Sequence, residues 1–357
     1  MSFQLPKFVS PDFSQSFLVD APDVRISEVK KDGVAPKGFL ITSISPEYFK
    51  IKGQWVLPTQ TSIECVAVAR DNNTVEIVEF RNLKACDKVV LGKSGDGSEG
   101  IYKYTSGFDN LPNVGLGRSV ESSFSRDYEE LHELLEYEKQ NNGHIVWVLG
   151  PAVVFDYDTR AALSELAENG YVNSLMAGNA MATHDLEGGL LGTALGQNIY
   201  TQESVFMGHY NHLDLINEAR RAGSIELLLN EQNIKDGFMK TCIEKDIPIV
   251  LVGSIRDDGP LPPVYHNVSC GLDAMKEQTD KATVIICLAT VLHSVATANL
   301  ASSYRLVDGK VRPVYFYSVD IAEYAVNQVS VAREYIGVKT IVTNVQDFVV
   351  NLQKNLR

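Results

Sequence analysis

The sequence predicts an α/β protein in which a small, mainly β region precedes a larger parallel sheet with helices on both faces. Residues 38–104 contain short apolar runs separated by turn-forming residues. Residues 144–357 instead alternate continuous apolar runs with amphipathic stretches. The length of 357 residues suits two domains better than one small core. We therefore expect a mainly β cap domain over 1–120, a linker helix over 121–143 and an α/β domain over 144–357.

The β region is predicted from its short strands and its turns. The turn-forming segments "RDNN" and "DGSEG" separate runs rich in β-branched and aromatic residues. The glycine-rich segment 92–100 lacks the Gly-Lys-Ser/Thr ending of a phosphate loop, so we expect a hairpin or loop there. The predicted strands cover 38–44, 48–57, 62–69, 74–80 and 88–92.

The linker is predicted as an amphipathic helix over residues 125–143. Ser125 suits the N-cap position, and Leu131, Leu134 and Leu135 share one face. A glycine at position 143 marks the end. The segment is therefore expected to be an amphipathic linker helix.

The C-terminal half alternates strand and helix. Its strands are continuous apolar runs, which are typical of parallel strands buried on both faces. The predicted strands cover 144–150, 171–178, 247–253, 283–289, 313–319 and 339–343. The predicted helices cover 159–169, 182–194, 211–245, 271–279, 291–301, 321–334 and the final residues. Ligands of such sheets bind beyond the carboxyl ends of the strands.

Glycines and polar side chains follow four of these strands, which predicts a ligand site at that edge. Candidate cofactor contacts are Gly150, Pro151, Asn179, Gly253 and Ser254, and candidate catalytic residues are His184, Arg256, Asp257, Asp258 and His293. In the loop "SIRDDGP" a carboxylate can act as a base and a guanidinium can clamp a substrate carboxylate, although a salt-bridged turn is the alternative.

Several of these candidates have structural alternatives. His184 suits a proton carrier or a buried, hydrogen-bonded imidazole, and the nearby Asp185 and Glu187 suit the positive end of a helix dipole. Asp320 and Asn344 follow the last two strands and are further candidate cofactor contacts. Asp320 can bind a ribose or cap a helix. Cys65, a further catalytic candidate, can cover the site or pack in a core.

Composition excludes several classes of function. The net charge of −13, without a Lys/Arg run, argues against nucleic acid. No apolar stretch approaches the roughly 20 residues of a membrane span, and the N-terminus lacks the order of a secretory signal. The five cysteines lack zinc-type spacing. We expect a cytoplasmic protein with reduced thiols, no metal site and no membrane partner.

Five segments, taken together and in this order, resemble one family. They are "GPAVVFD", "AGNAMATHDLEGGLLGTALG", "GHYNHLDLINEARRAGSI", "GSIRDDGPLPPV" and "TVLHSVATANL". The chain resembles the archaeal-type ornithine cyclodeaminases and the cyclodeaminase half of cyanobacterial arginine dihydrolase/ornithine cyclodeaminases, whose domain is called LOR/SDH bifunctional-type. The resemblance covers roughly residues 24–350 and includes "PKGFLITS", "GQWV" and "IECV" in the β region.

The resemblance implies a Rossmann-like, deoxyhypusine-synthase-like sheet that binds NAD, an amino-acid substrate and a homo-oligomer, either dimer or tetramer. It implies conversion of ornithine to proline with loss of ammonia. An additional N-terminal segment of longer members is expected to be missing, and "SPEYFKIK" and residues 92–110 diverge. Lysine, another diamino acid or an opine-type compound is an alternative substrate, and a non-catalytic NAD-binding module is an alternative function.

Overall fold

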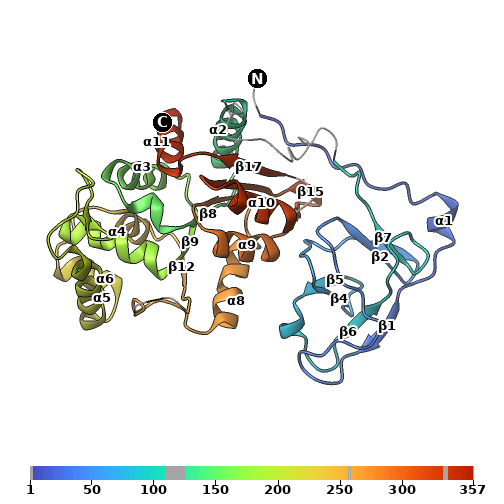
Figure 1. Cartoon of the computed structure of the whole chain (residues 1–357). Coiled ribbons are helices and arrows are strands. Elements are labelled where there is room, and N and C mark those ends of the chain that lie inside the picture. The colour runs from blue at the N-terminus through green and yellow to red at the C-terminus, as the bar shows by residue number, and fades with distance from the viewer. Residues whose placement is uncertain (1–2, 109–124, 256, 258, 333–336, 357) are drawn as a thin grey trace.

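The larger part of the protein is built on one six-stranded parallel sheet (Figure 1). The structure is a computed structural model that describes residues 3–108, 125–255, 257, 259–332 and 337–356. The strands are β8 (Ile145–Leu149), β9 (Ser174–Gly178), β12 (Ile249–Val252), β13 (Val284–Leu288), β16 (Tyr315–Asp320) and β17 (Val338–Val342). Each of the six predicted strands is therefore present, with bounds that differ by at most three residues at either end.

The strands lie in the order β12-β9-β8-β13-β16-β17, and all neighbouring pairs are parallel. Numbered by their place in the chain, this order is 3-2-1-4-5-6, which is the arrangement of Rossmann folds. The strand order reverses between β8 and β13, so the connections after these two strands leave toward opposite faces. A crevice at their carboxyl ends is the expected place for a ligand.

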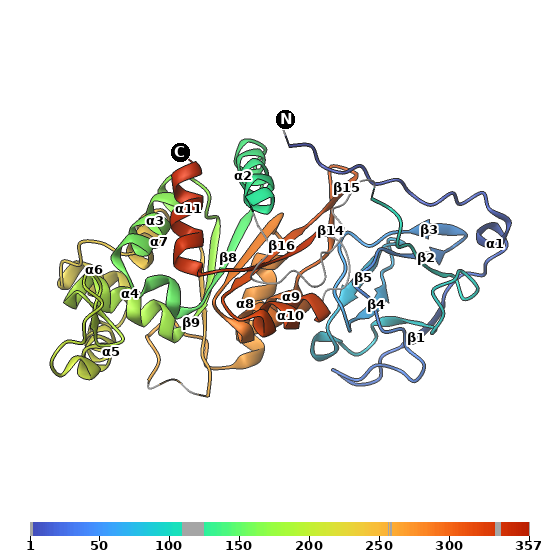
Figure 2. The ribbon, with the colours of Figure 1, turned by 45° about the horizontal axis from the view of Figure 1, so that its top comes forward.

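Helices cover both faces of the sheet, as predicted. One face carries α2 (Ser125–Gln140), α3 (Tyr157–Glu168), α4 (Asn179–Leu191), α7 (Phe238–Glu244) and α11 (Val345–Asn355). The other carries α8 (Val268–Thr279), α9 (Val291–Leu300) and α10 (Glu323–Ala332). Figures 1 and 2 show the two layers.

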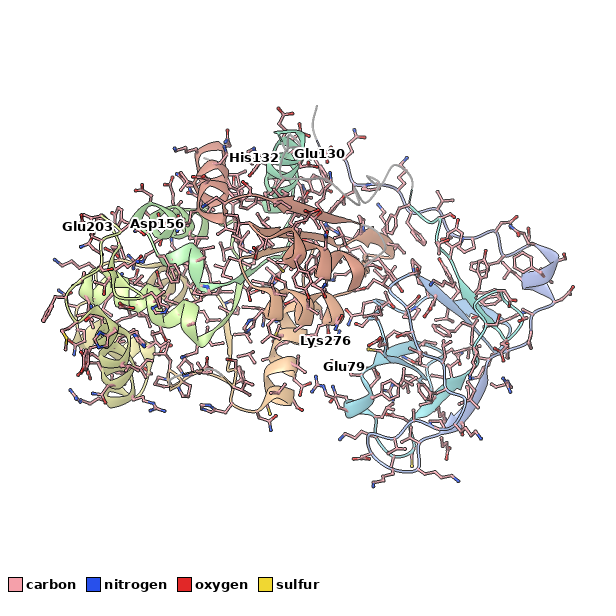
Figure 3. The ribbon with its side chains drawn as sticks, in the orientation of Figure 1. Glu79, Glu130, His132, Asp156, Glu203 and Lys276 are labelled. Atoms are coloured by element: carbon pink, nitrogen blue, oxygen red, sulfur yellow. The ribbon has the colours of Figure 1, made fainter. Side chains whose placement is uncertain are left out.

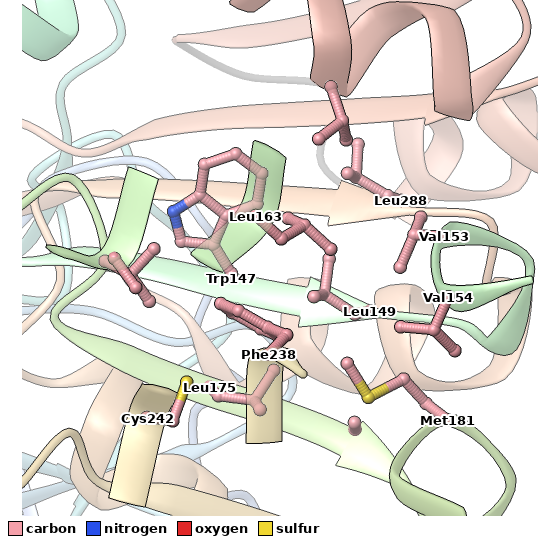
Figure 4. Close-up of a cluster of buried hydrophobic side chains, with 14 of the residues drawn as sticks. Trp147, Leu149, Val153, Val154, Leu163, Leu175, Met181, Phe238, Cys242 and Leu288 are labelled. Carbon is pink, nitrogen blue, oxygen red and sulfur yellow. The ribbon is translucent and has the colours of Figure 1, made fainter. Parts of the chain in front are cut away.

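Residues of β8 alternate between the two cores, which explains the continuous apolar runs. Trp147 and Leu149 point to the first face, where Figure 4 shows them with Phe238 and Met181. Val148 between them lies in the second core. Because both faces are covered, every position of the strand is buried and none selects a polar residue.

The predicted helix over 211–245 is three helices, α5 (Asn211–Ala222), α6 (Ile225–Glu231) and α7. Gly223 ends α5 with a φ of 89°, and Gly237 precedes α7 with a φ of 134°. Both values lie where L side chains are strained, so these glycines break the helical stretch. None of the described helices is long and apolar enough to cross a membrane.

The N-terminal region is antiparallel, with sheets ordered β1-β6-β4-β5 and β3-β2-β7. The strands are β1 (Arg25–Glu28), β2 (Glu47–Ile51), β3 (Gln54–Val56), β4 (Val66–Ala69), β5 (Val75–Val78), β6 (Lys88–Leu91) and β7 (Ile101–Lys103). Residues 92–100 form the predicted loop.

The predicted strand over 38–44 is wrong. Phe39 bridges to Leu91 of β6 and Ile41 bridges to Val66 of β4, each as an isolated bridge. Because the segment crosses from one partner strand to another, it forms no continuous ladder. The edge position beside β6 is occupied instead by β1, which was not predicted.

A hairpin that was not predicted, β14 (Tyr304–Val307) and β15 (Lys310–Pro313), joins the two parts. Its turn, Asp308-Gly309, has positive φ at both residues, as a tight hairpin turn requires. The Tyr304 hydroxyl donates to the Pro58 carbonyl at 3.0 Å, and the Leu306 N–H donates to the Thr59 carbonyl at 2.9 Å. The hairpin therefore holds the β region against the sheet domain.

A second contact lies at α8. Arg81 forms an ion pair with Asp273 at 2.8 Å and donates to the Ser269 carbonyl at 3.0 Å. Glu79 and Lys276 lie across the same junction in Figure 3. The predicted domain boundaries at 120 and 143 lie on either side of α2 and stay a prediction.

Candidate functional site

A cavity of about 570 Å³ lies at the carboxyl edge of the sheet, and four loops line it. These loops follow β8, β9, β12 and β13, which are the four strands around the reversal of strand order. Seven predicted site residues line it: Gly150, Pro151, Asn179, His184, Ser254, Asp257 and His293. The other lining residues include Phe155, Met181, Leu195, His212, Ile216, Thr290 and Leu292. The fold thus brings together side chains from four separate segments.

Two helices begin at this cavity without a side-chain cap. α4 starts after Gly178 and α9 after Thr290, and neither residue's side chain accepts a hydrogen bond from the first turn. In contrast, α3, α6, α8 and α11 are each capped by a side chain. The first-turn N–H groups of α4 and α9 therefore remain for a ligand, and both helix dipoles favour an anion there.

Crowding requires glycine at one of these loops and favours it at another. A Cβ on Gly150 would lie 1.9 Å from the carbonyl oxygen of Ala289, so the loops after β8 and β13 touch at the point of reversal. A Cβ on Gly178 would lie 3.0 Å from Cε1 of His293. The imidazole of His293 is therefore seated directly on the end of β9.

His293 is held by the ends of three strands. Its Nδ1 lies 3.3 Å from the Thr290 hydroxyl, and its ring lies on Gly178. Burial lowers the pKa of His293, although a hydrogen bond with the Val252 backbone and the charge of Asp257 oppose this shift. The lowered pKa makes the neutral imidazole the main form at neutral pH, so His293 can accept a proton.

His184 is paired with a buried carboxylate. Its Nδ1 lies 2.8 Å from Oε2 of Glu187, which is fully buried on the same helix. The alternative that Glu187 suits a helix dipole is therefore wrong, because its carboxylate is a partner of His184 and not a solvated charge near a helix start. Sequence reasoning had not paired these two residues, although their i, i+3 spacing is the signal for it.

Asp185 is also buried, and the dipole interpretation fails for it too. Its carboxylate accepts from Arg160 Nε at 2.8 Å and from the Met239 N–H at 2.7 Å. Arg160, only 1% exposed, also donates to Asp236 at 2.9 Å. A Cβ on Gly188 would lie 2.9 Å from the Arg160 guanidinium, so this glycine of "DLEGG" makes room for the ion pair.

The loop after β12 is tied to the site by two side chains. Asp257 accepts from the Ser254 N–H at 2.8 Å and closes a tight turn. Asn179 donates to the Gly259 carbonyl at 3.2 Å and accepts from the Leu261 N–H at 2.9 Å. Asn179 thus fixes the loop to the end of β9.

Two candidates of this loop, Arg256 and Asp258, lie outside the described residues. Gly253 lies between the lining residues Val252 and Ser254 but does not line the cavity itself. Its N–H donates to the Tyr265 carbonyl at 3.0 Å.

Three other candidates lie outside the lining of the cavity. Asp320 accepts from the Ala322 N–H at 2.9 Å, and Asn344 caps α11. Cys65 is buried in the β region beside a separate groove, and burial raises the pKa of its thiol to about 12. No group of three metal-binding side chains is present among the residues that the structure describes.

The fold and the cavity define a Rossmann-fold protein with a ligand cavity at its switch point. The profile of the family described as "Arginine dihydrolase ArgZ-like, C-terminal, Rossmann fold" matches residues 129–352. An ornithine cyclodeaminase of Methanocaldococcus jannaschii is 36% identical over 294 residues, which are 79% of this chain and 68% of that protein. The chain belongs to this ArgZ-like ornithine cyclodeaminase family, as its motifs predicted.

Two solved structures extend the comparison. A conserved putative LOR/SDH protein of Methanococcus maripaludis matches with a TM-score of 0.83 and 30% identity, covering 94% of this chain and 98% of that one. AgrE in ternary complex with ornithine and NAD⁺ matches with a TM-score of 0.59 and 29% identity, covering 94% of this chain and 46% of AgrE.

Proposed function

We propose that this protein is an NAD-dependent ornithine cyclodeaminase, which converts L-ornithine to L-proline and ammonia. The observation that carries the proposal is the convergence of His184, His293 and Asp257 on one cavity at the switch point of the sheet. The family of the chain and the ornithine and NAD⁺ bound by AgrE support the same reaction.

The volume, lining and donors of the cavity support a dinucleotide as its ligand. Its volume of about 570 Å³ lies within the range of small-molecule sites, and most of its lining is apolar. The uncapped starts of α4 and α9 supply N–H groups for a pyrophosphate. We propose Gly150, Pro151, Ser254 and Thr290 as contacts with the cofactor, whereas contacts of Asp320 and Asn344 stay predictions.

Bound NAD⁺ would accept a hydride from the substrate and return it after ring closure. The protein must then handle protons, because an ammonium group has no lone pair with which to form an imine or to attack one. His184 and His293 are the proposed proton acceptors, and the neutral form of His293 follows from its lowered pKa. Holding the two amine groups of one substrate close together favours ring closure.

Asp257 is proposed to organise the loop as well as to face the substrate. Its carboxylate is oriented by the Ser254 N–H, so it presents a fixed negative charge at the cavity wall. The described lining contains no Lys or Arg. Arg256, predicted from its place in the sequence, remains our proposed clamp for the substrate carboxylate, and Asp258 an alternative base.

The test is a direct assay with a matched set of variants. Purified protein with NAD⁺ and [¹⁵N]-L-ornithine should release ammonia and form proline, detected by mass spectrometry. Asp257→Asn and His184→Asn should each lower kcat by at least about 100-fold. The exposed Asp214→Asn is the control and should match the wild type. Ornithine turnover unchanged in both site variants would exclude these roles.

Substrate identity is tested by parallel assays with lysine, 2,4-diaminobutyrate and an opine. Faster turnover of one of these would assign the same scaffold to that substrate. NAD binding in calorimetry without turnover of any amino acid would favour a regulatory module.

We also propose that the chain self-associates through the segment from Leu191 to Leu213. This segment exposes large apolar side chains, of which Phe206 is 93% exposed. The others are Leu191, Leu195, Tyr200, Val205, Met207, Tyr210 and Leu213. Several large apolar side chains exposed in one short segment are typical of interfaces. Sedimentation should show a dimer or tetramer that Phe206→Glu dissociates, whereas Phe17→Glu, at a side chain 47% exposed, should not.

A further inference from the structure

The surroundings of His184 contain a hydrogen-bonded chain that ends at the cavity. Asn211 Nδ2 donates to the Thr193 hydroxyl at 2.8 Å. Thr193 Oγ1 donates to Glu187 Oε1 at 2.7 Å, and Glu187 Oε2 lies 2.8 Å from His184 Nδ1. The middle of this chain is closed to water, because Thr193 is 3% exposed and Glu187 is fully buried.

The donors around Glu187 determine where the shared proton lies. The Leu195 N–H donates to Oε2 at 3.2 Å, and the Gly196 N–H approaches Oε1 at 3.4 Å. Backbone N–H groups can only donate, and the Thr193 hydroxyl, which accepts from Asn211, donates its one proton to Oε1. Both carboxylate oxygens therefore act as acceptors. The proton between Glu187 and His184 then belongs to Nδ1, which leaves Nε2 as the ring atom with a lone pair.

The backbone that supplies these N–H groups is held in an unusual conformation. Leu195 and Gly196 form the two-residue turn between β10 (Thr193–Ala194) and β11 (Gln197–Asn198), with φ of 52° and 75°. A positive φ costs a leucine of the order of 1 kcal/mol. The Leu195 N–H lies 3.2 Å from both His184 Nδ1 and Glu187 Oε2. A bare Nδ1 would set its lone pair against a carboxylate lone pair at 2.8 Å, so we assign this N–H to Oε2 and the proton to Nδ1.

We propose that Glu187 is a positioning residue that fixes His184 in the tautomer with its proton on Nδ1, so that Nε2 presents its lone pair to the cavity. His184 lines the cavity, and Glu187 holds its Nδ1, so Nε2 is the ring nitrogen left for a ligand. Its use as a proton acceptor for the substrate rests on the proposed function, whereas the tautomer itself does not.

The variant Glu187→Gln tests the tautomer because it keeps the shape and changes one donor. The Gln carbonyl oxygen accepts from Thr193, and its NH₂ group donates to Nδ1, so the ring proton should move to Nε2. Long-range ¹H–¹⁵N spectra of histidine-labelled protein should show the bare nitrogen at Nε2 in the wild type and at Nδ1 in this variant. His184→Asn assigns the signal, and the exposed Glu203→Gln is the control for loss of one nearby charge.

The kinetic readout separates positioning from binding. Glu187→Gln should lower kcat for ornithine by about 100-fold or more, while KM and NAD affinity change by less than about 3-fold. Thr193→Val, which removes the donor to Oε1, should lower kcat by about 3- to 10-fold, and Thr193→Ser should retain more activity than Thr193→Val. The Thr193 pair keeps the test valid if Glu187→Gln fails to fold.

The outcomes distinguish this inference from the proposed function. A wild-type spectrum with the proton on Nε2, or no change in tautomer or kcat in Glu187→Gln, would overturn the inference even if ornithine is turned over. A wild-type protein that shows the Nδ1 tautomer and turns over no ornithine would overturn the proposed function and leave the positioning by Glu187 standing.

Discussion

Arg160→Met should destabilise the sheet domain strongly, because it leaves a buried charge without its partner. Arg160 makes two hydrogen bonds to Asp185. Its Nε donates to the carboxylate at 2.8 Å, and its Nη2 donates to the backbone carbonyl at 2.9 Å. In the variant, the fully buried Asp185 carboxylate loses its ion-pair partner. Among the described residues it is left with one hydrogen-bond donor, the Met239 N–H at 2.7 Å. Removing one partner of a buried ion pair costs about 3–5 kcal/mol. We expect the free energy of unfolding to fall by that amount.

Urea unfolding followed by circular dichroism measures this loss, and a thermal scan should show Tm lower by roughly 6–20 °C. The double variant Arg160→Met/Asp185→Leu removes the stranded charge, so it should be more stable than Arg160→Met alone. Arg221→Met is the surface control, because Arg221 is 68% exposed and its ion pair with Glu218 contributes at most about 1 kcal/mol. The reasoning is refuted if Arg160→Met costs less than about 1 kcal/mol, or if the double variant is less stable than the single one.

Three further predictions concern separate residues. Gly178→Ala should push the His293 imidazole, whose Cε1 would lie 3.0 Å from the new methyl group, and lower kcat by about 10-fold with the fold intact by circular dichroism. Burial raises the pKa of Glu47 from 4.5 to about 7, because it disfavours the charged carboxylate. The folded state therefore binds this proton more tightly than the unfolded state, and the resulting stability is present below pH 4.5 and is lost as pH rises to about 7. At 1.36 kcal/mol per unit this is about 3 kcal/mol, and Glu47→Gln should be stabilised over the wild type at pH 8 but not at pH 4 in urea titrations. With its pKa raised to about 12, the Cys65 thiol should resist iodoacetamide at pH 8, whereas the two exposed cysteines react; mass spectrometry counts the labels.

Local pattern in the sequence was sufficient for the elements of the larger domain. The strands β8 and β13 are apolar at every position because helices cover both faces, and this pattern is visible without a structure. Gly150 and the loop from Gly253 follow such strands directly, so their place at the carboxyl edge could be predicted as well. The family motifs predicted the membership that the comparisons then confirmed.

Pairing between distant segments was decided only by the tertiary structure. Periodicity shows that a segment is a strand but not which strand it joins, so the segment 38–44 was predicted as a strand although its two bridges go to different partners. The order β12-β9-β8-β13-β16-β17, which brings the loops after β8 and β13 together, is likewise a property of hydrogen bonds between remote strands. For the same reason Glu187 was interpreted as a charge suited to the positive end of a helix dipole. The burial of its carboxylate against His184 and Thr193 depends on how the β10–β11 hairpin folds back onto α4.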